Sequence, residues 1–168
     1  MIENKPIPIS VDGAGFEVLK DAVLSLLNQF PWLGGQSISY MGLDENGGIS
    51  VEPESGALIY SQKTDITGTV RQVCQFPFFV LYRSGASNEY QKAKISDFLD
   101  TLGSWVSKEP VTIDGETAKL EEYPELSGNR KITDIVRFNS YALAPNPNNT
   151  QDWVLPVTVN YTHEFESW

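Results

Sequence analysis

Residues that commonly carry catalysis are scarce in this chain, which has one histidine, His163, and one cysteine, Cys74. Each lies among alternating apolar residues typical of a strand. We therefore interpret His163 as a side chain satisfied within a half-buried sheet and Cys74 as an inert buried hydrophobe. A lone cysteine also excludes an intrachain disulfide and a thiolate metal cluster. With no nucleophile and base to pair, the sequence predicts a protein that is not an enzyme and needs no cofactor or metal.

Carboxylates are the other candidates for acid–base chemistry. They gather in two places, at Glu121, Glu122 and Glu125 and at Glu164 and Glu166. A hydrolase would need two carboxylates facing each other across a cleft, whereas acidic loops are usually solvated, so we favour solvated carboxylates here. The diglycines at 34–35 and 47–48 fit neither GxxxxGK[ST] nor GxGxxG, and we interpret both as turns rather than phosphate-binding loops.

Composition and charge limit the class of protein. The chain has 168 residues, 40% of them hydrophobic and 11% aromatic, which predicts one domain (residues 1–168) and excludes a disordered chain. A net charge of −10 argues against a basic face that neutralises nucleic-acid phosphates, although it would suit a channel through which DNA passes as cargo. Residues 1–10 lack a signal-peptide pattern and no long apolar run follows, so we expect synthesis in the cytoplasm and no membrane contact.

Two segments have the periodicity of amphipathic helices. Apolar residues recur at helical spacing over residues 16–30, where Asp12 can cap the start and Pro31 marks the end. The same spacing occurs over residues 88–107, with Ser87 as the expected N-cap. Each helix therefore has one apolar stripe that must pack against a core.

The remaining segments have the composition of strands and turns. The clearest strand covers residues 153–165, where apolar and polar residues alternate, and Pro156 within it predicts an edge strand or an amide that points outward. It should pair with a strand at 132–143 across an exposed loop at 144–152.

A long strand is predicted over residues 69–83, with a kink or bulge near Pro77 and an apolar even-numbered face. The other expected pairs are 57–62 with this long strand through the polar turn 63–68, and 37–41 with 49–52 as a hairpin around the turn 44–48. The sequence thus predicts an α+β fold, a mainly antiparallel sheet with both amphipathic helices packed on one face. The expected core includes Leu19, Val23, Leu26, Phe78, Val80, Phe98, Leu102, Trp105, Val157 and Val159.

Three polar turns are the expected contact sites for partners, namely residues 44–48, 63–68 and 144–152. Loops on a rigid scaffold commonly carry function, and the third is longer than a hairpin requires. Trp32 and the terminal Trp168 are two further aromatic residues, each of which could either pack internally or anchor a partner. The candidate contact residues are Asp44, Glu45, Asn46, Lys63, Thr64, Asp65, Asn146, Asn148, Asn149 and Trp168.

Four segments follow one another along the chain, 19–27 (LKDAVLSLL), 75–83 (QFPFFVLYR) running into 88–100 (NEYQKAKISDFLD), and the closing segment 154–166. Their pattern and order resemble the tail terminator, or tail completion, proteins of long-tailed bacteriophages, some of which are labelled minor capsid proteins. The plan of that family is an N-terminal amphipathic helix, strands with a protruding hairpin, a second helix and closing strands. The resemblance covers most of the chain, while the Glu-rich segment 111–127 is longer and more polar than the plan.

The resemblance implies a structural virion protein of the tail and neck. Such a protein forms a hexameric ring on the last ring of the completed tail tube, stops tube growth and presents the surface that docks to the head. Its partners would be copies of itself, the tail tube protein and the head–tail connector protein. The charge also fits a small acidic protein-binding module, or an inhibitor that mimics nucleic acid, either of which would remain a monomer or dimer.

Overall fold

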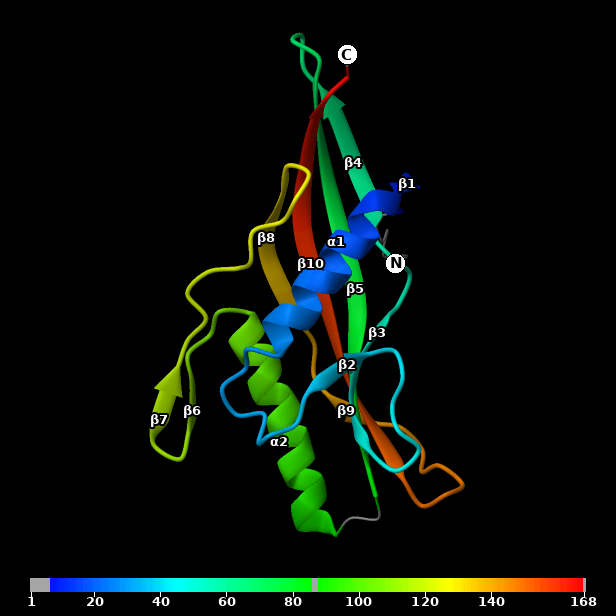
Figure 1. The fold of residues 1–168 in the computed structure, drawn as a ribbon, viewed down its shortest axis with the longest axis vertical. Helices are drawn as coiled ribbons and strands as arrows, with labels where there is room; N and C mark the ends of the chain where they lie inside the picture. Colours follow the sequence, from blue (N-terminus) through cyan, green and yellow to red (C-terminus); the bar gives the residue numbers. More distant parts are fainter. Residues whose placement is uncertain (1–6, 86–87, 168) are drawn as a thin grey trace, which may run out of the picture.

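The structure, a computed structural model, describes residues 7–85 and 88–167. The fold is α+β, with two helices and a mainly antiparallel eight-stranded sheet, as predicted. A separate two-stranded sheet stands beside the second helix (Figure 1).

Two long strands form the centre of the sheet, β5 (Thr69–Ser84) and β10 (Gln151–Glu166). They pair antiparallel along their whole length without a register shift, from Thr69 opposite Glu166 to Ser84 opposite Gln151. The remaining strands lie on either side of this pair. Beside β5 lie β3 (Gly48–Pro53) and β4 (Leu58–Thr64), with β1 (Ser10–Val11) on β4 and β2 (Ile38–Tyr40) on β3; beside β10 lie β8 (Arg130–Arg137) and β9 (Tyr141–Ala142).

The two strand prolines lie where the neighbouring strands are interrupted. The Pro77 carbonyl of β5 accepts a hydrogen bond from the Glu54 amide (3.1 Å), between the end of β3 and the start of β4. The Pro156 carbonyl of β10 accepts from the Phe138 amide (3.0 Å), between β8 and β9. Because the nitrogen and carbonyl of one strand residue point to the same side, neither missing N–H interrupts the β5–β10 ladder.

The expectations for these prolines were therefore only partly right. The strand that contains Pro156 is a central strand and not an edge strand. The other expectation holds, because the Pro156 nitrogen, which carries no hydrogen, points away from the β5–β10 hydrogen bonds. The bulge expected near Pro77 is absent from the β5–β10 pairing, and the irregularities lie instead in β4, between Ile59 and Ser61, and between β10 and β8 at Asn160.

Both helices, α1 (Gly13–Leu27) and α2 (Glu89–Val106), pack on the same face of the sheet (Figure 1). The Phe16 ring of α1 lies 5.9 Å from Phe76, and the Phe98 ring of α2 lies 5.6 Å from Tyr82, on the even-numbered face of β5. Phe30 joins the two helices through an edge contact with Trp105, 5.5 Å between ring centroids.

The ends of the helices differ slightly from expectation. Asp12 caps α1 as predicted, but the helix ends at Leu27, before the expected Phe30. The N-cap of α2 is Asn88, in a capping box with Gln91, and the predicted cap Ser87 lies outside the described residues.

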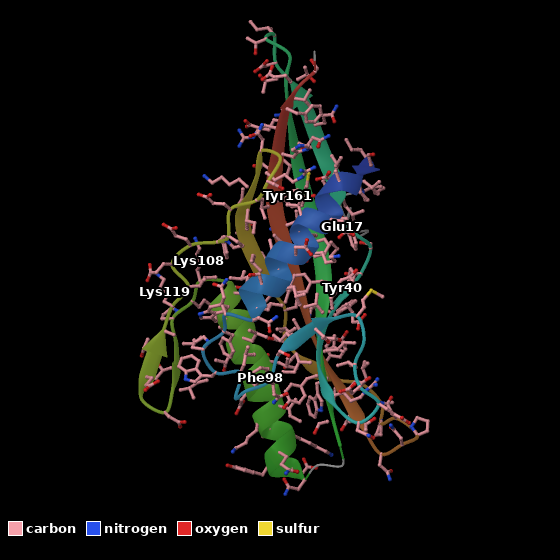
Figure 2. All side chains as sticks on the ribbon, viewed as in Figure 1. Glu17, Tyr40, Phe98, Lys108, Lys119 and Tyr161 are labelled. Atoms are coloured by element: carbon pink, nitrogen blue, oxygen red, sulfur yellow. The ribbon has the colours of Figure 1, made fainter. Side chains whose placement is uncertain are left out.

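The predicted core is confirmed almost completely. Nine of the ten residues are at most 4% exposed, and the tenth, Phe98, is partly buried against the same cluster. Figure 2 marks Phe98 on the helical side of the molecule. Trp32 also packs internally, with its ring 5.7 Å from Phe30, which favours packing over partner contact for this residue.

The hairpin predicted for residues 37–52 is wrong, because β2 and β3 pair in parallel with Ile38 opposite Ile49. The Asn28 side chain at the end of α1 bonds both backbone groups of Ile38, at 2.8 and 2.9 Å. That tertiary contact sets the direction of β2, while the turn at 44–48 closes only a short bridge between Asp44 and Gly47.

Two other segments depart from expectation. The strand predicted for 132–143 is two strands, β8 and β9, separated at residues 138–140. The Glu-rich segment contains a hairpin that the sequence analysis missed, β6 (Val111–Ile113) and β7 (Glu116–Ala118). Its turn, Asp114-Gly115, has positive φ at both residues (50° and 81°), and an Asp-Gly pair directly after the β-branched run Val111-Thr112-Ile113 is a strong hairpin signal.

Candidate interaction surfaces

The face of the sheet opposite the helices, here called the outer face, carries a column of exposed apolar side chains along β8 and β9. Val136, Phe138, Tyr141 and Leu143 are 39%, 54%, 47% and 42% exposed. They lie level with even-numbered residues of β10, whereas its odd-numbered residues such as Leu155, Val157 and Val159 are buried beneath the helices. The alternation of strand side chains therefore places this column on the uncovered face.

The apolar column continues across the sheet onto the central strands. Pro156 lies opposite Phe79, and Val154 lies between Leu81 and Tyr141 in the strand register. Phe79, Leu81 and Pro156 are partly exposed, and Val154 is buried by its position among them. The result is a continuous apolar area over several strands rather than scattered residues, a feature that marks protein–protein contact sites.

Charged pairs border the outer face at both ends. At one end Arg83 makes a bidentate contact with Asp152, at 2.7 and 2.9 Å. The side-chain hydrogen bond lowers the pKa of Asp152 and raises the pKa of Arg83. At the other end Arg71 lies 3.5 Å from Glu164. An apolar centre with a polar rim has the anatomy of an interface that forms after folding.

Two of the three predicted contact loops meet at one end of the molecule. The Asn148 side chain donates to the Glu45 carbonyl (3.1 Å), and Arg83 donates to the Asp44 carbonyl (3.3 Å). These contacts join the loop after β9 to the turn before β3, so that the candidate residues Asp44, Glu45, Asn46, Asn146, Asn148 and Asn149 form one surface.

The loop after β9 is ordered by its own side chains. The Asn148 carboxamide accepts from the amide and hydroxyl of Thr150, at 3.3 and 2.6 Å, and the Asn146 amide donates to the Thr150 carbonyl at 2.7 Å. Asn149 adopts positive φ, 63°, which asparagine tolerates. The loop is shorter than predicted, because β10 already begins at Gln151.

The third predicted contact loop lies at the opposite end of the long axis, next to the C-terminal end of β10 (Figure 1). Lys63 and Thr64 belong to β4, and Asp65 begins the turn. The Ser167 amide donates to the Gly68 carbonyl (2.8 Å), which ties the turn to β10. Trp168, the remaining candidate contact residue, lies outside the described residues.

Sequence analysis missed the most exposed apolar side chain of this turn. Ile66 is 101% exposed, while the polar residues beside it bond to one another. An isoleucine inside a four-residue turn was the available signal, since such positions favour Gly, Asn, Asp and Ser.

His163 and Cys74, the two residues considered for chemistry, lie on the paired strands β10 and β5 but face different partners, His163 opposite Gln72 and Cys74 opposite Tyr161. The Nδ1 atom of His163 lies 3.0 Å from the Gln72 side-chain oxygen, and burial lowers the pKa of this half-buried imidazole. Cys74 is buried, and burial raises the pKa of its thiol to about 11. Among residues 7–85 and 88–167 no group of three His, Cys, Asp or Glu residues could hold a metal ion.

The carboxylates considered above also fail to converge on one cleft. Glu121, Glu122 and Glu125 lie in an irregular segment after β7, whereas Glu164 and Glu166 lie at the far end of β10. Glu164 faces Arg71, and Glu166 accepts a hydrogen bond from the Thr69 hydroxyl at 2.9 Å.

A buried ion pair joins the start of α1 to β8. Arg130 contacts both carboxylate oxygens of Asp12 at 2.9 Å, and the Tyr161 hydroxyl donates to the same carboxylate at 2.8 Å. Burial by itself raises the pKa of Asp12, but the hydrogen bonds from Arg130, Tyr161 and the Gly15 amide outweigh it and hold the pKa below its ordinary value. Figure 2 labels Tyr161 on β10 at the level of α1. Because the Asp12–Arg130 pair is buried, we interpret it as an ion pair that stabilises the fold and not as a substrate site.

No helix in the described part of the chain is long and apolar enough to cross a membrane. Neither a scan against protein-family models nor a search of curated proteins finds a match for this chain.

Proposed function

We propose that the protein is a structural virion subunit of a long-tailed phage, which caps the completed tail tube as a homohexameric ring and forms the head–tail joining interface. The observation that carries the proposal is the uncovered outer face. A monomer that works alone has little reason to leave Phe138, Tyr141 and Val136 in one exposed column, because apolar surface is stabilised by removal from water.

A terminating ring needs several separate contact surfaces on each subunit. Neighbours in a closed ring meet through two different patches, and further patches must contact the tail tube protein below and the head–tail connector above. The outer face, the surface of joined loops at one end and the turn at the other end are three distinct surfaces that can divide these contacts. Their separation along one rigid sheet supports an assembly role better than a single binding cleft would.

The charge of the chain supports the same role. A net charge of −10 in each subunit would give a ring a strongly negative surface. DNA that passes through a negative lumen is repelled from the wall, so the ring would guide the genome without holding it.

Two measurements test this function. The particle mass in solution, alone and mixed with a tail tube protein, should show a ring-sized species or tube-dependent assembly. A monomer or dimer that leaves the tube unbound would favour the acidic binding module or the nucleic-acid-mimicking inhibitor and refute the proposal.

The outer face can be tested by substitution. Phe138→Ser together with Tyr141→Ser should leave the monomer folded, because both side chains are about half exposed, but should abolish capping in a tail-length or head-joining assay. Tyr90→Ser is the matched control, since Tyr90 lies on α2 and is 67% exposed. Normal capping by the double variant would show that the outer face is not a contact.

A further inference from the structure

The turn before β3 carries the single Asn-Gly pair of the sequence, Asn46-Gly47. Asn46 is exposed and lies, with Glu45, between the bridged residues Asp44 and Gly47. Its side chain makes no hydrogen bond within residues 7–85 and 88–167. The Asn46 carboxamide can therefore turn toward the backbone nitrogen of the residue that follows it.

The other asparagines of the surface of joined loops differ from Asn46 in their bonding or in the residue that follows. The Asn148 side chain is held by Thr150 and by the Glu45 carbonyl, with its shortest bond at 2.6 Å. Asn149 is exposed but is followed by the β-branched Thr150, whose side chain crowds the next amide. An unbonded carboxamide and an unhindered neighbour thus coincide at Asn46.

The fold itself favours glycine after Asn46. A β-carbon at position 47 would lie 3.3 Å from the Arg83 carbonyl of β5, which is tighter than most contacts of a β-carbon. Glycine has no such atom and can adopt conformations that other residues avoid. The same property that admits β5 at this point leaves the Gly47 nitrogen open to the side chain before it.

Long hydrogen bonds hold this turn. The Gly47 amide donates to the Asp44 carbonyl at 3.3 Å, and Arg83 donates to the same carbonyl at 3.3 Å. Both distances exceed the usual range of about 2.7–3.2 Å for a bond from nitrogen to oxygen. The Gly47 amide is therefore weakly bonded, and its nitrogen can leave the Asp44 carbonyl at little cost.

We propose that Asn46 is a site of spontaneous covalent modification, in which the Gly47 amide nitrogen attacks the side-chain carbonyl carbon of Asn46. A new C–N bond closes a five-membered imide ring, the bond to the side-chain NH2 breaks, and ammonia leaves with the proton of the Gly47 amide. Water then adds to either carbonyl of the ring and opens it, which leaves aspartate or isoaspartate at position 46. Solvent supplies the water, because the turn is exposed.

Both products change the surface of joined loops. A carboxylate replaces a neutral amide beside Asp44 and Glu45, in a chain that already has a net charge of −10. Isoaspartate also routes the backbone through the side-chain carbon, so the chain between positions 46 and 47 becomes one atom longer. That extra atom should displace the Asp44–Gly47 bridge and the Glu45 carbonyl to which Asn148 donates. The reaction needs only this turn and water, so it is independent of the ring function proposed above.

The test incubates the full folded chain in mildly alkaline buffer and follows its peptides by mass spectrometry. The peptide with Asn46 should gain the mass difference between NH2 and OH, whereas the peptide with Asn149 should keep its mass. Conversion should be slower in mildly acidic buffer, because the Gly47 amide must lose its proton to attack. Asn46→Gln is the matched control, since it keeps the amide but requires a six-membered ring that closes more slowly, and its peptide should stay unchanged. Circular dichroism should show the same fold for both proteins.

Three outcomes would overturn the inference. Conversion of Asn46 in urea but not in the folded chain would show that the native turn blocks the reaction. Conversion of Asn149 at the same rate would show that the fold confers no preference for Asn46. Formation of aspartate without isoaspartate would exclude the imide, because fragmentation distinguishes the two products and isoaspartate forms only through the ring.

Discussion

The buried pair of Asp12 and Arg130 gives the clearest prediction about stability. Both side chains are only 6% exposed, and within the described residues the guanidinium makes one other hydrogen bond, to the Ser127 carbonyl at 3.5 Å. Asp12→Asn keeps the shape and much of the helix cap but removes the negative charge, which leaves the guanidinium buried without its counter-ion. Breaking a buried pair in this way costs about 3–5 kcal/mol.

That cost is a large part of the ~5–15 kcal/mol that keeps a typical domain folded, so it should be plain in urea unfolding followed by circular dichroism. Arg130→Met should cost a comparable amount. The double variant should be less destabilised than the sum of the two single changes, because neither unpaired charge then remains. Glu164→Gln, in the exposed pair with Arg71, is the control and should change the free energy of unfolding by less than about 0.5 kcal/mol.

The same pair predicts a dependence on pH. The pKa of Asp12 is lowered in the folded protein from its ordinary value of 3.8, so the folded state favours the carboxylate. Its contribution to stability is therefore complete above pH 3.8 and is lost as the pH falls through the lower folded pKa. The gap in stability between wild type and Asp12→Asn should shrink on acidification within that range. If both single variants lose less than about 1 kcal/mol of unfolding free energy near neutral pH, the reasoning is refuted, because an unpaired buried charge is strongly destabilising.

Three further predictions follow from other parts of the fold. Leu102→Ala should lower the free energy of unfolding by about 2–5 kcal/mol, since Leu102 is fully buried, and a change below about 0.5 kcal/mol in urea unfolding would place it outside the core. Cys74 should resist thiol reagents at pH 8 and react only in denaturant, because its thiol is buried with a pKa near 11; rapid labelling of the native protein would contradict this. Shortening residues 144–150 to a two-residue turn, with Asp152 and its ion pair retained, should leave the circular dichroism spectrum unchanged but abolish tail completion, and normal tails joined to heads would exclude this loop as a contact.

The sequence alone determined the features that depend on local periodicity. Apolar spacing identified both helices, alternation identified the two long strands, and together they identified nine buried core residues, because a side chain's face within a helix or strand follows from its position in the repeat. The polar turns at 44–48, 63–68 and 144–152 were located for the same local reason, since Asp, Asn, Gly and Pro favour turns wherever they occur, although the turn at Asp114-Gly115 was missed.

Tertiary structure decided the features that depend on contacts distant in sequence. Asn28 holds β2 parallel to β3 although the intervening turn resembles a hairpin, because its side chain satisfies the backbone of Ile38. Pro156 is tolerated in a central strand because its neighbours break beside it, which no property of residues 153–165 could reveal. The exposed column on β8 and β9 exists because both helices cover the other face. The full exposure of Ile66 is known only once its turn is seen to project beyond the rest of the chain, since exposure is a property of the packed molecule and not of the residue.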